Sequence, residues 1–433
     1  MSEDQRLPST RLGVAVDHAS TERNARAVVR RRRGGIGLLG PAFVAAIAYV
    51  DPGNVAANLT AGAEYGYLLL WVLVAANLMA MVVQYLSAKV GLVSGASLPE
   101  LLGARMRTWP RRLYWLQAEL VAAATDVAEV IGGALALYLL FAVPLPLGGL
   151  IVGLVSMLLL AVQSRRGQRS FEFVVLGLLG IIAIGFLAGL LLSPLDGEGI
   201  LAGLVPRFEG SQTVLLAAGM LGATVMPHAV YLHSALARDR HGAHNSPARL
   251  RTLLKATRWD VTLSLVLAGG VNIAMLLLAA ASLPGVAGTD TIEGAHAAIS
   301  VELGPTIGVI FAIGLLASGL ASTSVGCYAG AAIMSGLLHI RVPMVLRRAI
   351  TLIPALILLS IGIDPTWALV LSQVLLSIGL PFALIPLVRL TGSAALMGQF
   401  RNGRVLHTIS WIVILLIVAL NLVLIYLTLT GQA

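Results

Sequence analysis

The sequence has 433 residues, of which 58% are hydrophobic and 11% are charged, with a mean hydropathy of +0.90 and a net charge of +9. A soluble chain of this length needs far more polar surface, and apolar runs of about 20 residues recur along it, so the composition indicates a polytopic helical membrane protein. The positive charges lie in short segments between these runs, which argues against a nucleic-acid-binding face. The single Cys327 excludes an intrachain disulfide and a cluster of thiolate metal ligands.

The chain begins with a polar segment, Met1 to about Gly34, that is rich in arginine. We expect this segment (1–34) to be a disordered cytoplasmic arm, followed by one transmembrane domain over 35–433. A cleaved signal peptide is not expected, because the apolar run after the arm is too long and has no evident small-residue cleavage site.

Eleven apolar segments follow, each long enough to be a membrane-spanning helix. They lie at about 37–61, 68–92, 113–141, 146–163, 173–193, 212–235, 258–282, 305–335, 345–363, 366–390 and 407–430. With the N-terminus in the cytoplasm, every lysine and arginine except Arg207 falls in the arm or at a cytoplasmic connection. By the positive-inside rule, this asymmetry predicts an odd number of spans and an extracellular C-terminus.

The first span is interrupted by Asp51-Pro52-Gly53-Asn54. Proline cannot donate the helical hydrogen bond, so the helix should unwind here, and unwound backbone at membrane depth is tolerated only inside protein or around a cavity. A carboxylate at this depth costs about 2.5–3.5 kcal/mol, so Asp51 needs a partner. Asn54 offers an amide oxygen close by. We interpret the two as ligands for a cation; the alternative is that Asp51 caps the helix that follows.

The third span carries three carboxylates, Glu119, Asp126 and Glu129, whose spacing places them on one helical stripe. Three carboxylates are too costly to face lipid. Asp126 and Glu129 are i,i+3 neighbours, so repulsion should keep one of them protonated, as a proton relay requires. The alternative is a buried polar network with Arg347 and Arg348 of the ninth span, and the two interpretations are compatible.

The sixth span is interrupted in the same way, by Met226-Pro227-His228. A thioether is a poor ligand for Ca²⁺ or Mg²⁺ but suits softer transition metals, so Met226 would favour those ions unless it only packs against apolar neighbours. His228 could bind metal or carry a proton. Because it lies two residues after Met226 on a helix, it should point elsewhere, which favours the proton or hydrogen-bond role.

Other residues of the spans give weaker signals. Gln373 of the tenth span and Asn272 of the seventh could each neighbour a ligand or join two packed helices. Four glycines are more typical of close helix packing than of chemistry: Gly177, Gly180, Gly326 and Gly330.

The matched interruptions of the first and sixth spans predict an internal repeat. We expect an all-α polytopic membrane protein with two inverted five-helix repeats, at about 37–193 and 212–390, and an eleventh helix at about 407–430. Interrupted segments at matching positions of two halves are also the best pointer in sequence to a transporter's substrate site.

Four segments of the sequence resemble the Nramp family of divalent-metal transporters: YVDPGNVAANL, QAELVAAATDVAEVIGGALAL, GATVMPHAVYLHSAL and LSQVLLSIGLPFALIPL. The resemblance covers about residues 35–430, and DPGN and MPH placed five spans apart are highly specific together. It implies a LeuT-like fold with discontinuous helices 1 and 6. It is strongest to the bacterial branch of proton-coupled manganese importers. Branches that carry magnesium or aluminium lack the methionine, so Met226 argues against them.

The resemblance also implies roles for particular residues. Asp51, Asn54 and Met226 would supply side-chain ligands for the metal. Backbone carbonyls of Ala48 and Ala223, and later Gln373, would complete the metal site. The proton pathway would comprise Asp51, Glu119, Asp126, Glu129, His228, Arg347 and Arg348.

We therefore expect a multi-pass plasma-membrane transporter, not an enzyme, that imports Mn²⁺ and accepts Fe²⁺ together with protons. The metal is the substrate and the proton is the coupled ion, so we expect no cofactor. We expect the protein to lie in the lipid bilayer and to need no nucleic acid and no obligate protein partner. The alternative is a cation-coupled transporter of another small substrate on the same fold, such as an amino acid. Asp51 at the first break would repel the carboxylate of such a substrate.

Overall fold

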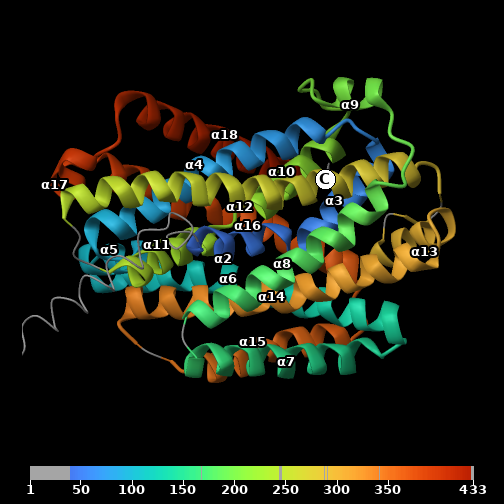
Figure 1. The fold of residues 1–433 in the computed structure, drawn as a ribbon, viewed down its shortest axis with the longest axis horizontal. Coiled ribbons are helices and arrows are strands. Elements are labelled where there is room, and N and C mark those ends of the chain that lie inside the picture. Colours follow the sequence, from blue (N-terminus) through green and yellow to red (C-terminus); the bar gives the residue numbers. More distant parts are fainter. Residues whose placement is uncertain are drawn as a thin grey trace, which may run out of the picture.

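The computed structural model describes residues 40–166, 168–242, 246–286, 288–289, 291–340 and 342–430. The arm predicted at 1–34 lies outside these residues. The described chain is nearly all helical, and most of its helices run along one common direction (Figure 1). Eight of the described helices are long and apolar enough to cross a membrane. The predicted class, an all-α polytopic membrane protein, is therefore confirmed.

The helices of the described chain have the following bounds. They are α2 (Pro41–Ile47), η2 (Ala48–Val50), α3 (Pro52–Tyr65), α4 (Leu70–Ser94), α5 (Leu98–Arg105), α6 (Thr108–Phe141), α7 (Leu145–Arg166), α8 (Gln168–Leu190), α9 (Gly197–Gly203), α10 (Ser211–Thr224), α11 (Pro227–His241), α12 (Pro247–Ser282), α13 (Ile292–Glu302), α14 (Pro305–Leu338), α15 (Met344–Ser360), α16 (Pro365–Gly392), α17 (Ala394–Met397), η3 (Gly398–Phe400) and α18 (Arg404–Leu429).

Three of the eleven predicted spans are not among the eight long helices. The first is divided into α2, η2 and α3, the fourth corresponds to α7, and the ninth corresponds to α15, which has 17 residues with Pro354 inside it. The connections after the fifth and seventh predicted spans hold the short helices α9 and α13. The division into repeats at 37–193 and 212–390 stays a prediction.

Both predicted interruptions are present. Asp51 has an extended backbone (ψ 167°) between η2 and α3, and Pro52 is the first residue of α3, where its missing N–H breaks no helical hydrogen bond. In the second break α10 ends at Thr224 and α11 begins at Pro227, with Met226 in an extended conformation (ψ 124°). In each case a proline starts the second half-helix, so the same local chemistry makes both breaks.

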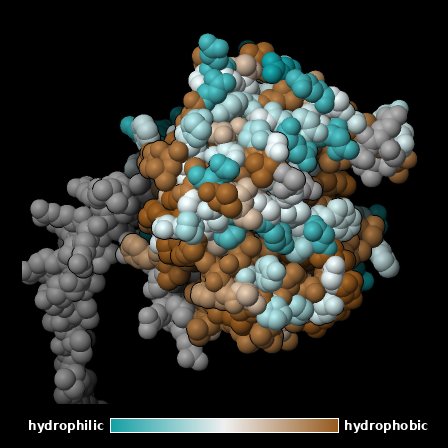
Figure 2. All heavy atoms as spheres, turned by 90° about the vertical axis from the view of Figure 1, so that its right-hand side faces the viewer, coloured by the Kyte–Doolittle hydropathy of each residue, from teal (hydrophilic) through white to brown (hydrophobic). Residues whose placement is uncertain are grey.

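The two broken segments lie in the middle of the bundle. α12 packs along α3 and α4, α11 packs along α4, and α14 packs along α6 and α8. α7 and α15 pair at one edge of the molecule, shown at the bottom of Figure 1. Figure 2 looks onto the end that carries α9 and α13, where hydrophilic residues are spread over the end and hydrophobic residues gather along its sides. This distribution fits a bundle that exposes apolar sides to lipid.

The start of α2 is fixed by a carboxylate from another helix. Asp260 of α12, itself 3% exposed, accepts hydrogen bonds from the backbone N–H groups of Gly40 and Ala42, each at 3.0 Å. The residue between them, Pro41, has no N–H to satisfy. We call this pair of bonds the α2 cap contact. It satisfies donors that a helix start leaves unpaired, and it places a negative charge at the positive end of the helix.

Candidate functional site

Asp51 lies at the first break with no exposed surface. One carboxylate oxygen, Oδ1, accepts the backbone N–H of Asn54 at 2.8 Å, which is an N-terminal cap of α3. The other oxygen, Oδ2, has a long contact of 3.4 Å with Nε2 of Gln373. The capping alternative raised by the sequence is therefore real, but it occupies Oδ1, and Oδ2 keeps most of its capacity to accept.

The two breaks contact each other through the side chain of Asn54. Its Nδ2 donates to Asp51 Oδ1 at 2.7 Å and to the backbone carbonyl of Ala223, in the last turn of α10, at 3.0 Å. Both partners are acceptors, so the amide must present its nitrogen to them. The amide oxygen, Oδ1 of Asn54, is buried and has no hydrogen-bond partner among the described residues. Two predicted metal-site residues of the first break, Asp51 and Asn54, are therefore brought together with a third, Ala223, that lies 169 positions from Asn54.

Gln373 reaches this site because α3 carries glycine at its second position. A Cβ atom on Gly53 would lie 1.6 Å from Nε2 of Gln373, so any larger side chain would displace the amide from its position beside Asp51. Gln373 belongs to α16, and its buried Oε1 has no hydrogen-bond partner within the part of the chain that the structure describes. The sequence left open whether Gln373 neighbours a ligand or joins two helices, and the structure places it next to Asp51.

Two carbonyls freed by the first break are held by side chains from other helices. Asn272 of α12 donates to the carbonyl of Tyr49 at 2.7 Å, and Ser318 of α14 donates to the carbonyl of Val50 at 2.5 Å. Asn272 thus supports the unwound backbone, which is one of its two predicted roles. Ser318 was missed, because α14 carries several small hydroxyl residues and sequence does not show which of them bonds to another segment.

Met226 and Ala48 belong to the same broken segments. Met226 is the N-cap residue of α11 and Ala48 is the first residue of η2, and neither has more than 1% of its surface exposed. Among the described residues, no three His, Cys, Asp or Glu side chains come together as a metal site. A metal held at the breaks would therefore need amide, thioether and carbonyl ligands, as the sequence predicts.

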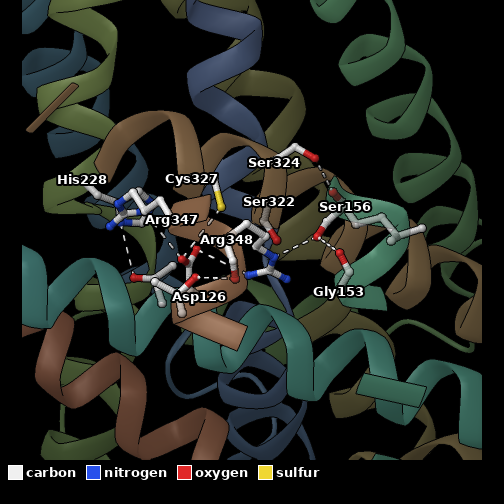
Figure 3. Close-up of polar contacts among 12 residues, drawn as sticks. Asp126, Gly153, Ser156, His228, Ser322, Ser324, Cys327, Arg347 and Arg348 are labelled. Atoms are coloured by element: carbon white, nitrogen blue, oxygen red, sulfur yellow. Dashed lines mark hydrogen bonds and ion pairs between the residues drawn. The ribbon is translucent and has the colours of Figure 1, made fainter. Parts of the chain in front are cut away.

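A second polar cluster joins α6 to α15. Nη2 of Arg347 lies 2.5 Å from Oε1 of Glu119, and Nη1 lies 3.7 Å from Oδ2 of Asp126. Arg348 lies 3.9 Å from Oδ1 of Asp126 and donates to Ser156 of α7 at 2.8 Å, so both arginines converge on Asp126 (Figure 3). The buried network that the sequence offered as an alternative is thus formed, and a proton relay through it remains compatible.

Glu129 is the carboxylate of this cluster that has no ion pair. Within the described part of the chain, neither of its oxygens has a hydrogen-bond partner, although the side chain is fully buried. His228, in the first turn of α11, turns toward α6, where Nδ1 lies 3.5 Å from Oγ1 of Thr125, and its Nε2 has no partner. The cluster holds three carboxylates against two guanidinium groups, an excess of one negative charge that a proton would neutralise.

Two of the four glycines noted in the sequence lie against this cluster. A Cβ on Gly330 would lie 2.0 Å from Cζ of Arg347, and one on Gly326 would lie 3.0 Å from Oδ1 of Asp126. They therefore make room for charged groups as well as for helix packing. Among the described residues, a Cβ on Gly177 or Gly180 of α8 would meet nothing within 4 Å, so close helix packing is not seen at these two positions.

The fold of this chain recurs in solved structures. A crystal structure of the Eremococcus coleocola manganese transporter, with an aromatic bis-isothiourea compound, matches at a TM-score of 0.81 and 32% identity, covering 89% of this chain and 86% of that one. A structure of MhsT in complex with L-phenylalanine, 15% identical, matches at a TM-score of 0.60 over 88% of this chain and 98% of that one, which shows the fold alone. These matches define a membrane transporter with a LeuT-like fold.

The family follows from the sequence relatives. The model of the family described as Nramp, natural resistance-associated macrophage protein-like, matches residues 42–427. A Mycobacterium tuberculosis protein named divalent metal cation transporter MntH is 62% identical over 394 residues, which cover 91% of this chain and 92% of that protein. The chain belongs to the Nramp family. It is therefore a transporter and not an enzyme.

Proposed function

We propose that this protein carries divalent transition-metal ions across the plasma membrane into the cytoplasm, with Mn²⁺ preferred and Fe²⁺ accepted, in symport with protons. The relatives named as divalent metal cation and manganese transporters support the substrate class. The observation that carries the proposal is the contact of Asn54 with both Asp51 and Ala223, because it joins the two breaks around one buried carboxylate.

The amide nitrogen of Asn54 lies where the two breaks meet. It donates to the carboxylate of Asp51 and to the carbonyl of Ala223, the two oxygens that would bind a metal. A half-turn of the amide about its Cβ–Cγ axis would replace Nδ2 by Oδ1, the atom that lacks a partner. Metal entry would thus exchange two hydrogen bonds for three oxygen ligands. Met226 would add a soft ligand that favours transition metals over Ca²⁺ and Mg²⁺.

Protons would move through the α6 cluster and the first break. The cluster has one carboxylate more than it has guanidinium groups, and Glu129 is the one without an ion pair among the described residues. We propose that Glu129 holds a proton that exchanges with Asp51 and His228, while Arg347 and Arg348 pair with Glu119 and Asp126. An inside-negative potential adds about 2.3 kcal/mol per charge per 100 mV to the entry of cation and proton.

The test is transport by the purified protein in proteoliposomes that contain a metal dye and a pH dye. With acid outside and a negative potential inside, Mn²⁺ uptake should be accompanied by proton influx and should persist with Ca²⁺ in large excess. Uptake of Ca²⁺ as fast as Mn²⁺ would contradict the metal assignment. Mn²⁺ uptake at the same rate without a pH gradient and without proton movement would contradict symport.

A further inference from the structure

A cavity of about 450 Å³ lies away from both polar clusters, between α4, α10 and α18. Each helix contributes one stripe of apolar side chains to it, spaced by three or four residues. Representative lining residues are Ala75 and Met79 of α4, Ala217 and Leu221 of α10, and Ala419 and Val423 of α18. Nothing in the described lining offers water the two or more polar partners that it needs, so the cavity is suited to hydrocarbon.

The position of this cavity determines which hydrocarbon can reach it. Among the eight candidate spans of the described chain, α18 is the least buried, with 29% of its most apolar stretch buried. Two residues that line the cavity from α18, Leu416 and Val423, are 52% and 43% exposed. The cavity therefore opens on the side of the molecule that a bilayer covers. A lipid acyl chain can enter it laterally, without crossing water.

One end of the cavity has the chemistry of a membrane–water interface. Trp71 and Phe208 line that end and pack edge to face at 5.3 Å, and the indole N–H of Trp71 donates to the carbonyl of Arg207 at 3.3 Å. Tryptophan is enriched at this depth of a membrane because its ring is amphipathic. Nε of Arg207 lies 3.7 Å from Oε1 of Glu209, and the Arg207 side chain is 51% exposed, so its guanidinium group can also bind the phosphate of a lipid.

We propose that this cavity, the α4–α10–α18 groove, binds one acyl chain of a phospholipid whose phosphate lies at Arg207. The chain would pack on α10, whose last residue, Thr224, comes two residues before Met226. α10 also lies close against α16, since a Cβ on Gly222 would be 2.6 Å from the carbonyl of Gln373. The bound chain therefore supports the half-helix that carries one wall of the metal site. The binding itself does not depend on which ion the protein carries.

The experiment uses the full-length protein in proteoliposomes that contain a trace of phosphatidylglycerol with a diazirine in its acyl chain. After illumination, labelled peptides are identified by mass spectrometry, and tightly held lipids are counted by native mass spectrometry of the purified protein. The groove variants are Ala419→Trp and Ala75→Trp, which fill the groove from opposite walls. The matched control is Leu415→Trp on α18, which is 67% exposed and does not line the groove.

We expect saturable labelling of α4, α10 and α18 and one retained phospholipid, both lost in the two groove variants and kept in Leu415→Trp. Arg207→Gln should weaken retention of the phospholipid but not of diacylglycerol, which has no phosphate. Labelling that increases linearly with probe concentration, and that is equally strong on α7 and α15, would overturn the proposal, because ordinary boundary lipid gives this result. Retention that is unchanged in both groove variants would also overturn it.

Discussion

Of the residues that the structure describes, Asp51 is the anionic side chain at the contact between the two breaks. Asp51→Ala should abolish metal binding and uptake, because a dication would then lack charge compensation in a low dielectric and Asn54 would lose a hydrogen-bond acceptor. Mn²⁺ binding and proteoliposome uptake would be measured together. Asp196→Ala is a matched control, since it also removes a carboxylate that caps a helix, at the exposed start of α9. Near-normal uptake by folded Asp51→Ala would refute the ligand assignment.

Met226 should determine selectivity more than rate. Met226→Ala leaves the oxygen ligands but removes the soft one, so Cd²⁺ uptake should weaken most and Ca²⁺ should begin to compete with Mn²⁺. The measurement is uptake of Mn²⁺ and Cd²⁺ with Ca²⁺ in large excess. Met220→Ala, a truncation of an equally buried methionine on α10, is the control for lost packing. If the two variants have the same competition profile, the sulfur of Met226 only packs.

Gly53 should affect metal affinity through its contact with Gln373. In Gly53→Ala the new methyl group would overlap Nε2 of Gln373, and this flexible side chain would move away from Asp51 while the fold is kept. We expect metal affinity to fall on the order of tenfold, which corresponds to about 1.4 kcal/mol. Gln373→Ala should cost about the same, and the double variant no more than either single one. Additive losses would show that Gly53 acts by another route.

At the scale of the element, variants of α6 should separate proton movement from metal binding. Asp126→Asn and Glu129→Gln keep size and hydrogen bonding but remove a titratable proton, and they lie on a different helix from Asp51. Metal affinity should fall modestly, while acceleration of uptake by external acid should shrink. Two dyes in one proteoliposome report both fluxes, and Glu198→Gln on α9 is a neutral control. Wild-type proton flux in both variants would contradict a role in proton movement and would show that the two carboxylates are only structural partners of the arginines.

The elements that sequence predicts best are those set by local chemistry. Both breaks follow from prolines in apolar runs, and the α6 stripe follows from helical spacing, so these could be derived without a structure. The short helices α9 and α13 could not, since their polar residues resemble those of loops. Residues that act across the fold were also invisible: Ser318 and Asp260 each bond to backbone more than 200 positions away, and no local pattern encodes such a contact.

The same limit applies to the conformation of the site. The place of Asn54 after Asp51 in the sequence was enough to propose it as a ligand. The direction in which its amide points could not be predicted, because it depends on the carbonyl of Ala223 in the other half of the chain. Likewise, Gly326 and Gly330 give the sequence signal of packed helices, whereas their neighbours are the charged groups of the α6 cluster. A glycine in sequence does not reveal what approaches it.

At the scale of the whole molecule, the α2 cap contact joins the start of the first broken span to α12. Asp260→Asn should loosen it, because an amide offers one acceptor in place of two and its N–H₂ group would face a donor. Hydrogen–deuterium exchange of the backbone amides over 40–47 should become faster. Asp364→Asn, which alters a carboxylate cap at the exposed start of α16, is the control. Unchanged exchange over 40–47 would mean that side-chain packing alone holds α2.

The energy of that contact bounds how often α2 can leave its place. Hydrogen bonds to a charged group contribute about 1.5–3 kcal/mol each, so two bonds amount to about 3–6 kcal/mol. In an ensemble at equilibrium, a conformer without them would be rarer by a factor between about 10² and 10⁴. A substrate or proton can make this conformer common only if it binds the conformer without the α2 cap contact more tightly, by at least that factor, than the conformer with it. Two backbone amides and one carboxylate thus set a lower limit on how strongly a substrate or proton must prefer the conformer in which α2 has left its place.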